Sequence, residues 1–222
     1  MDRIQTGIPG LDDMIGGGLP VPSITLIAGE AGTGKTTFCN QFLCKGAELK
    51  EPGLYLTIFG GSAGQVFKFA STYEFFRDDY FCRDLQYMDL GEAIENTKRA
   101  EDVLEIIKSE ITKFQSKRVV VCNPSELQAI LENDYRRFLL KYARMVKDLN
   151  AASLITGDAA PGSPYPLDLA HISDGIILLH NIEVNFIRRR TVEVLKMAGT
   201  SHMSGKHALD ISAKGLTVYP GL

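Results

Sequence analysis

A buried-strand pattern runs straight into a glycine-rich turn and then a helix, and this junction constrains the fold more than any other feature of the chain. The apolar run Ile24–Ala28 precedes the turn, and a helical pattern over Lys35–Glu48 follows it. Glycine accepts the left-handed dihedrals that point successive backbone N–H groups at one anion, and the positive amino end of the helix faces the same anion. The order of strand, loop, Lys-Thr and helix therefore predicts a site for the phosphates of a nucleoside triphosphate.

Individual residues of this loop have expected roles at the phosphates. Lys35 reaches the β- and γ-phosphates, and the hydroxyl of Thr36 is the expected Mg²⁺ ligand. Such a loop reads phosphates rather than a base, so it does not by itself select adenine. The residues predicted to contact the nucleotide in this segment are Gly29, Glu30, Ala31, Gly32, Thr33, Gly34, Lys35, Thr36 and Thr37.

The rest of the chain alternates strands with helices and then changes to strands alone. From Gly175 onward, the strands follow one another without helices between them, so this part is expected to be antiparallel. The pattern predicts a three-layer α/β/α fold, with a mostly parallel central sheet and antiparallel strands at its C-terminal edge. Helices are predicted over 65–73, 101–115 and 135–149, and strands over 54–58, 85–88, 119–121, 154–156, 176–179, 191–197, 208–211 and 216–218.

Other segments give weaker signals. Residues 1–20 read as turns that lead into the first strand, and three prolines between 161 and 166 predict an extended loop. Residues 74–99 mix aromatic and charged side chains without a clear period outside the short strand at 85–88. The four cysteines lack metal-ligand spacing and are expected to be free thiols: Cys39, Cys44, Cys82 and Cys122.

Length and charge narrow the class of protein. A chain of 222 residues without a linker pattern is expected to form one domain over residues 1–222. Its net charge of −3 gives no overall attraction to nucleic acid or to an anionic membrane. No apolar run reaches the roughly 18 residues that a membrane span needs, and the first residues lack a signal-peptide pattern. We therefore expect a soluble, cytoplasmic protein without a membrane partner.

Motifs along nearly the whole chain resemble those of the KaiC-like ATPases of the RecA superfamily. The opening Thr6-Gly7-Ile8, with Gly10-Leu11-Asp12 and Gly17-Gly18-Leu19-Pro20 after it, is similar to the start of that family. Gln41-Phe42-Leu43 resembles its first helix. The most specific segments are Arg188-Arg189-Arg190-Thr191, Glu193-Val194-Leu195-Lys196-Met197, Gly199-Thr200-Ser201-His202 and, at the end, Ile211-Ser212 with Gly215-Leu216.

This resemblance implies a RecA-like P-loop domain that assembles into a ring, usually a hexamer, with ATP or ADP and Mg²⁺ between neighbouring subunits. It implies that Thr72 lies near the nucleotide of its own subunit. It also implies that a second segment reaches across the interface to the neighbour's triphosphate. The residues of that segment are Lys196, Met197, Ala198, Thr200 and His202. Without the resemblance, Lys196 reads as an ordinary exposed lysine at a strand end.

The chain departs from this family where hydrolysis is concerned. Cys122 ends the strand at 119–121, where P-loop enzymes carry the acidic residue of the Mg²⁺ shell. Gly60 and Gly61 replace two adjacent glutamates that activate water, so general-base help from these positions is absent. Ala198 replaces a trans-acting arginine, a group that contributes about 10³–10⁵ in rate where it operates. Ala170 and His171 replace the phosphorylated Ser-Thr pair of the clock protein in this family.

These departures lead to three competing hypotheses. The first is a regulatory or signalling protein that binds adenine nucleotide, forms a homo-oligomer and has lost or nearly lost hydrolysis, with an unidentified protein partner. The second is a working ATPase, in which Asp158 or Glu30 supplies the missing carboxylate. The third is a DNA-strand-exchange protein, but the segment 158–174 contains no lysine or arginine. Neutralising a phosphate backbone requires cations, so nucleic acid is disfavoured.

Overall fold

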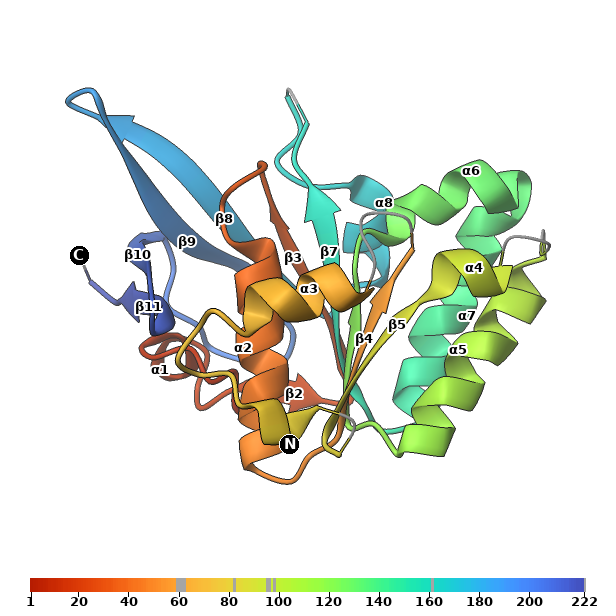
Figure 1. Cartoon of the computed structure of the whole chain (residues 1–222). Helices are drawn as coiled ribbons and strands as arrows, with labels where there is room; N and C mark the ends of the chain where they lie inside the picture. The colour runs from red at the N-terminus through yellow and green to blue at the C-terminus, as the bar shows by residue number, and fades with distance from the viewer. Residues whose placement is uncertain (59–62, 82, 95–96, 98, 161, 222) are drawn as a thin grey trace.

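The computed structural model describes residues 1–58, 63–81, 83–94, 97, 99–160 and 162–221. These residues form a nine-stranded sheet with the strand order β11-β10-β9-β8-β3-β7-β6-β4-β5 and a separate two-stranded sheet of β1 and β2. Helix α2 packs on one face of the large sheet together with α3, and α5 and α7 pack on the other (Figure 1). The predicted three-layer α/β/α architecture is confirmed.

The strands of the large sheet divide into two groups by direction. From β5 to β8 all neighbours pair in parallel, whereas β9, β10 and β11 continue the sheet with antiparallel pairing. The strands are β3 (Ser23–Gly29), β4 (Gly53–Thr57), β5 (Leu85–Asp89), β6 (Arg118–Val121), β7 (Ala152–Asp158), β8 (Gly175–Val184), β9 (Ile187–Met197), β10 (Lys206–Ser212) and β11 (Gly215–Tyr219).

Helices connect the parallel strands and cover both faces. The main helices are α2 (Lys35–Glu48), α3 (Ala63–Ala70), α5 (Ala100–Phe114) and α7 (Tyr135–Asp148). The short α-helices are α1 (Leu11–Met14), α4 (Leu90–Ile94), α6 (Gln128–Leu131) and α8 (Leu167–Ile172), and the 3₁₀ helices are η1 (Asp78–Tyr80), η2 (Pro124–Leu127) and η3 (Glu132–Asp134). In the part of the chain that the structure describes, no helix has the length and apolar character required to cross a membrane.

Three local features differ from the sequence-based expectation. Residues 1–20 contain β1 (Asp2–Ile4), α1 and β2 (Leu19–Val21) and not only turns, because β1 and β2 pair with each other. Within the loop predicted to be extended, α8 forms directly after Pro166, where a fixed φ suits a helix start. Strand β8 belongs to both groups, since it pairs in parallel with β3 and antiparallel with β9.

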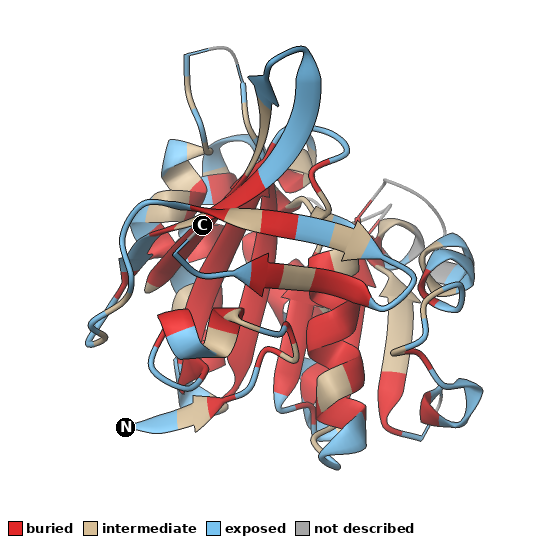
Figure 2. Cartoon of the chain, turned by 90° about the vertical axis from the view of Figure 1, so that its left-hand side faces the viewer, coloured by how far each residue is buried: buried red, intermediate tan, exposed pale blue. Residues whose placement is uncertain are grey.

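Strands β8 and β9 form a long hairpin that projects from the body of the molecule. Its outer part is exposed, in contrast to the buried strands at the centre of the sheet (Figure 2). Asn185 and Phe186 make its two-residue turn, both with positive φ, as a hairpin turn of type I′ requires. The apolar runs predicted only its inner half, because charged and polar residues interrupt the outer half, where Val184, Phe186 and Ile187 are exposed apolar side chains.

The thiols that the structure describes are free, as expected. Cys39 and Cys44 are buried on α2, and Cys122 is partly buried at the end of β6. Burial raises the pKa of the Cys44 thiol to about 12, so it stays protonated at neutral pH. Cys82 lies outside the described residues.

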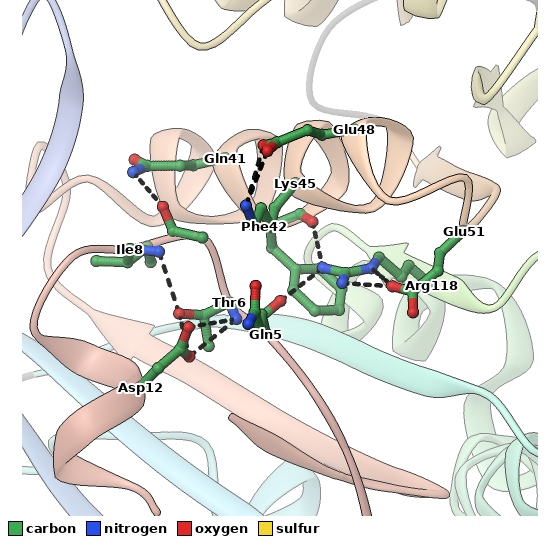
Figure 3. A network of polar contacts seen from close by, with 11 residues as sticks. Gln5, Thr6, Ile8, Asp12, Gln41, Phe42, Lys45, Glu48, Glu51 and Arg118 are labelled. Atoms are coloured by element: carbon green, nitrogen blue, oxygen red, sulfur yellow. Dashed lines mark hydrogen bonds and ion pairs between the residues drawn. The ribbon is translucent and has the colours of Figure 1, made fainter. Parts of the chain in front are cut away.

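A network of polar contacts fastens the N-terminal segment to the body (Figure 3). Arg118, at the start of β6, is fully buried and donates to the carbonyl oxygens of Gln5 and Phe42, each at 2.7 Å. The same guanidinium pairs with Glu51 at 2.6 Å and stacks on the ring of Phe42. Buried arginine is stable only when its donors are used, and here three elements supply the acceptors.

Two further side chains extend this network. The carboxylate of Asp12 accepts hydrogen bonds from the backbone N–H and the hydroxyl of Thr6, which holds the turn before α1. Gln41 on α2 donates to the carbonyl oxygen of Gly7 and exchanges hydrogen bonds with the backbone of Leu216 on β11. The segment that resembles the start of the KaiC-like family is therefore a structural part of the core.

Candidate nucleotide-binding site

The predicted phosphate-binding loop lies between β3 and α2 at the carboxyl edge of the parallel strands (Figure 1). Gly32 and Gly34 have φ values of 76° and 106°, in the left-handed region that glycine tolerates. A side chain at Gly29 is excluded for another reason, because its Cβ would lie 2.2 Å from the carbonyl oxygen of Leu179. The loop thus has the backbone conformation that the sequence pattern predicts.

Lys35 folds back over this loop. Its ammonium group donates to the carbonyl oxygens of Gly29 at 2.7 Å and Glu30 at 2.9 Å. The same nitrogen pairs with a carboxylate oxygen of Asp158 at 2.9 Å. Asp158 is the last residue of β7 and is level with Gly29 in the parallel register. A triphosphate in the loop would therefore compete with Asp158 for this ammonium.

Asp158 is ionised in this arrangement. Burial alone would raise the pKa of its carboxyl, but hydrogen bonds from Lys35 and Asn123, together with the charge of Lys35, outweigh burial and hold this pKa below its usual value. The ion pair is therefore present above the unfolded-state pKa of an aspartate, about 3.9, and is lost as the pH falls through the lower folded-state value.

A cavity of about 300 Å³ opens beside the loop and collects side chains from several elements. Lys35 and Thr36 line it from the start of α2, and Thr57 and Tyr55 from β4. Gln65 lines it from α3, and the remaining polar lining comes from the strand ends and turns on the other side: Cys122, Asn123, Glu126, Thr156 and Asp158. The predicted Mg²⁺ ligand Thr36 and the candidate replacement carboxylate Asp158 therefore face one cavity.

Cys122 occupies the end of β6, as the sequence indicates. Its sulfur accepts a hydrogen bond from the hydroxyl of Thr156 at 3.6 Å, and that hydroxyl also accepts from the backbone N–H of Asn123 at 2.9 Å. Tyr55, on the neighbouring strand, is deeply buried, and burial raises the pKa of its phenol well above the usual value. The phenol of Tyr55 therefore stays neutral and supplies no charge beside Cys122.

The donor set in the cavity fits Mg²⁺ only in part. Oxygen ligands are available from the Thr36 hydroxyl and from carboxylates, as a hard cation requires. No cluster of three or more His, Cys, Asp or Glu side chains able to hold a metal ion occurs among the described residues. Any cation here would depend on oxygen atoms of the phosphates as well. The two predicted glutamate replacements, Gly60 and Gly61, lie outside the described residues.

Two other residues predicted to contact the nucleotide, Thr37 and Thr72, form hydrogen bonds within the chain. The hydroxyl of Thr37 lies 3.1 Å from that of Tyr73, so the turn after α3 touches the start of α2. Thr72 is exposed and donates to the carbonyl oxygen of Phe69 at 2.8 Å. Both lie next to the loop through this contact, although Thr72 does not itself line the cavity described above.

The second predicted segment lies elsewhere on the chain. Met197 is paired with Gly175, which is level with Thr25, whereas Gly29 is level with Leu179. Four residues along a strand correspond to about 13 Å, so this segment lies toward the opposite end of β3 from the loop. The structure therefore does not bring these residues to the loop within one chain.

The residues of this second segment differ in exposure and in the hydrogen bonds that they form. Lys196 is exposed and donates to the carbonyl oxygen of Ser173 at 2.7 Å. The side chain of Met197 is buried in its own core, so only its backbone is open to a neighbour. Ala198 is exposed, the hydroxyl of Thr200 accepts from Arg3 at 2.8 Å, and a ring nitrogen of His202 lies 3.3 Å from the carbonyl oxygen of Met203.

Sequence reasoning missed three residues near the loop. Asn123 and Glu126 follow β6 in an irregular turn, and Arg190 on β9 donates to the carbonyl oxygen of Gly32 at 3.3 Å. Arg190, which the sequence analysis named only within a family-like motif, contacts the loop of its own chain. Only the strand pairing reveals this, because β9 is separated from β3 by β8 alone.

Comparison with known proteins agrees with this geometry. A family model described as KaiC ATPase matches residues 4–222. The UPF0273 protein of Thermotoga maritima is 30% identical over 98% of this chain and 96% of its own length. The circadian clock oscillator protein KaiC of Parathermosynechococcus lividus is 31% identical over 97% of this chain but only 42% of its own length.

A solved structure gives the same result for the fold. The KaiC-like protein of the archaeon Pyrococcus horikoshii superposes with a TM-score of 0.87 at 30% identity, over 99% of both chains. This chain thus spans less than half of the clock protein but nearly all of the shorter relatives. It belongs to the KaiC ATPase family, with the RecA-like fold of that family.

Proposed function

We propose that this chain is a regulatory, cytoplasmic KaiC-like domain, formed by residues 1–222, that binds ATP or ADP at the loop 29–37 and hydrolyses ATP very slowly or not at all. The observation that carries this proposal is the contrast within one cavity. The loop and Lys35 are arranged for phosphates, whereas a thiol ends the strand that would supply the acidic residue.

Binding and chemistry depend on different parts of such a site. Phosphates are held by backbone N–H groups, by Lys35 and by the amino end of α2, and this chain keeps all of these parts of the phosphate-binding motif. Rate acceleration needs charge and a base directed at the transition state. When bound, Mg²⁺ would neutralise phosphate charge, and Thr36 is the residue of the loop that would hold it. The substitutions at Cys122 and Ala198 remove only the second kind of group.

Assembly is the second part of the proposal. The loop and the segment around Lys196 lie toward opposite ends of the sheet, which is the arrangement that a head-to-tail interface requires. A nucleotide bound between two copies would favour assembly, since it binds the interface and not the free subunits. The expected product is a closed ring, with six subunits by analogy with the family. A protein partner would then recognise the assembled state.

Nucleotide content and turnover test the first part together. Protein purified without added nucleotide is expected to release ATP or ADP on denaturation, as detected by mass spectrometry. Steady-state phosphate release in Mg²⁺ and ATP is expected to be at the background level. Turnover at the rate of active KaiC-like ATPases would overturn the loss of hydrolysis and favour a working ATPase, for which Asp158 is the nearest carboxylate to Lys35.

Changing Lys196 to alanine tests the assembly. We expect the variant to lose nucleotide-dependent oligomers in light scattering while the unfolding midpoint stays within experimental error, because the side chain is exposed and, among the described residues, its ammonium donates to a single carbonyl oxygen. Lys113→Ala, an exposed lysine on α5, is the matched control and should assemble normally. Unchanged oligomers in Lys196→Ala would remove this segment from the interface.

A further inference from the structure

Glu126 reaches the nucleotide cavity from a turn that sequence motifs do not mark. After β6, Asn123 adopts a left-handed conformation with φ of 53°, and Pro124 starts the short helix η2. This turn brings the chain back over the carboxyl edge of the sheet, so that Glu126 lines the same cavity as Lys35 and Thr36. A carboxylate is therefore present in the cavity although Cys122 cannot supply one.

One side-chain amide ties Glu126 to Asp158. The nitrogen of Asn123 donates to a carboxylate oxygen of Asp158 at 3.1 Å and lies 3.4 Å from Oε1 of Glu126. Asp158 uses its other oxygen on Lys35. The two carboxylates are thus held on one side of the cavity, and the ammonium of Lys35 serves only one of them.

The second oxygen of Glu126 is not compensated. Oε2 is buried and has no hydrogen-bond partner within the described part of the chain. A buried oxygen of this kind is costly to leave unpaired, and a carboxylate needs a proton or a cation near it. The cavity also contains the Thr36 hydroxyl, which is the expected ligand of Mg²⁺ in this motif. A hard divalent cation with oxygen ligands is the group that meets both requirements.

We propose that Glu126 supplies the negative charge that stabilises the Mg²⁺ of a bound nucleotide, in place of the acidic residue that Cys122 replaces. This inference rests on the proposed nucleotide binding. Its role is in binding and not in hydrolysis, because the sequence has Gly60 and Gly61 where the family has the glutamates that activate water. Asn123 acts as a positioning residue, since its amide holds Glu126 and Asp158 side by side.

Calorimetric titration of ATP, with MgCl₂ or with EDTA, tests the proposal in the full-length chain. Glu126→Gln is expected to weaken binding about tenfold in Mg²⁺, the effect of losing about 1.4 kcal/mol of charge interaction. In EDTA the same variant should bind ATP as well as the unmodified chain or better, because a negative charge near the phosphates is gone. Glu105→Gln, an exposed glutamate on α5, is the matched control and should match the unmodified chain in both solutions.

The signs of the two effects separate the possible outcomes. A merely structural role of Glu126 would weaken ATP binding equally with and without Mg²⁺. If Glu126→Gln binds ATP in Mg²⁺ as tightly as the unmodified chain, the carboxylate does not serve the cation. Either result overturns the proposal. Adding Cys122→Asp to Glu126→Gln is expected to restore the Mg²⁺ effect, which a structural role would not permit. If the unmodified chain binds ATP in neither solution, the proposed nucleotide binding itself fails.

Discussion

Replacing Lys35 with alanine is expected to weaken ATP binding about 100-fold, to the point where protein purified from cells carries no nucleotide. Hydrogen bonds to charged groups contribute about 1.5–3 kcal/mol each, and this ammonium is expected to reach two phosphates. The loss is larger than that of one contact because Asp158 would remain beside the triphosphate without its counter-ion. Titration of ATP by calorimetry and mass spectrometry of the purified protein both measure the effect.

A second substitution at the same ion pair should act in the opposite direction. In the described structure the ammonium is occupied by two carbonyl oxygens and by Asp158. Asp158→Asn keeps the shape and the capacity to bond with Asn123, but it releases Lys35 and removes a negative charge. We therefore expect Asp158→Asn to bind ATP several-fold more tightly at neutral pH, by about 1 kcal/mol of lost competition.

For the first variant, an ATP affinity of Lys35→Ala within a factor of three of the unmodified chain would contradict the assignment of the loop.

The parts of the fold that were predicted from sequence are those with long periodic patterns. The faces of α5 and α7 and the apolar runs of β3, β6 and β7 each repeat one signal over several residues, and the structure confirms them. Short elements were missed because four or six residues carry too little pattern. Examples are α1, whose Leu11 and Met14 are buried in the core, and α8, which packs against α7 and β3; packing rather than their own short sequences stabilises them.

In the candidate site too, the residues next to a clear sequence pattern were predicted and the others were missed. The loop and Cys122 were located because each follows a recognisable strand. Glu126 was missed because its position depends on the left-handed turn at Asn123, and hydrophobic periodicity does not predict such a turn. Asp158 was considered as a substitute carboxylate, and the structure adds its ion pair with Lys35. Thr200 was expected near a neighbouring nucleotide from the resemblance alone, and its hydrogen bond from Arg3 could not be read from the sequence because the two residues are 197 positions apart.

Replacing Arg118 with alanine is expected to reduce the free energy of unfolding by about 3–5 kcal/mol, the range for removing one partner of a buried ion pair. The guanidinium is fully buried and has contacts to Glu51, Gln5 and Phe42. Its removal leaves a carboxylate and two carbonyl oxygens without their donor, and it also removes the stacking on Phe42 (Figure 3). Urea unfolding followed by circular dichroism measures the change.

Two matched variants show whether burial is the cause. Glu51→Gln keeps a hydrogen-bond acceptor and should cost about 1–2 kcal/mol, since the two backbone contacts of Arg118 remain. Arg137→Ala removes an arginine of which 61% is exposed, and its loss should stay below about 0.5 kcal/mol. A loss below 1 kcal/mol for Arg118→Ala would mean that the N-terminal segment is not held by this contact. If the segment is released as expected, amide hydrogen exchange around Gln5 should rise at denaturant concentrations where β3 is still protected, because Arg118 bonds the carbonyl oxygen of Gln5 to the body of the molecule.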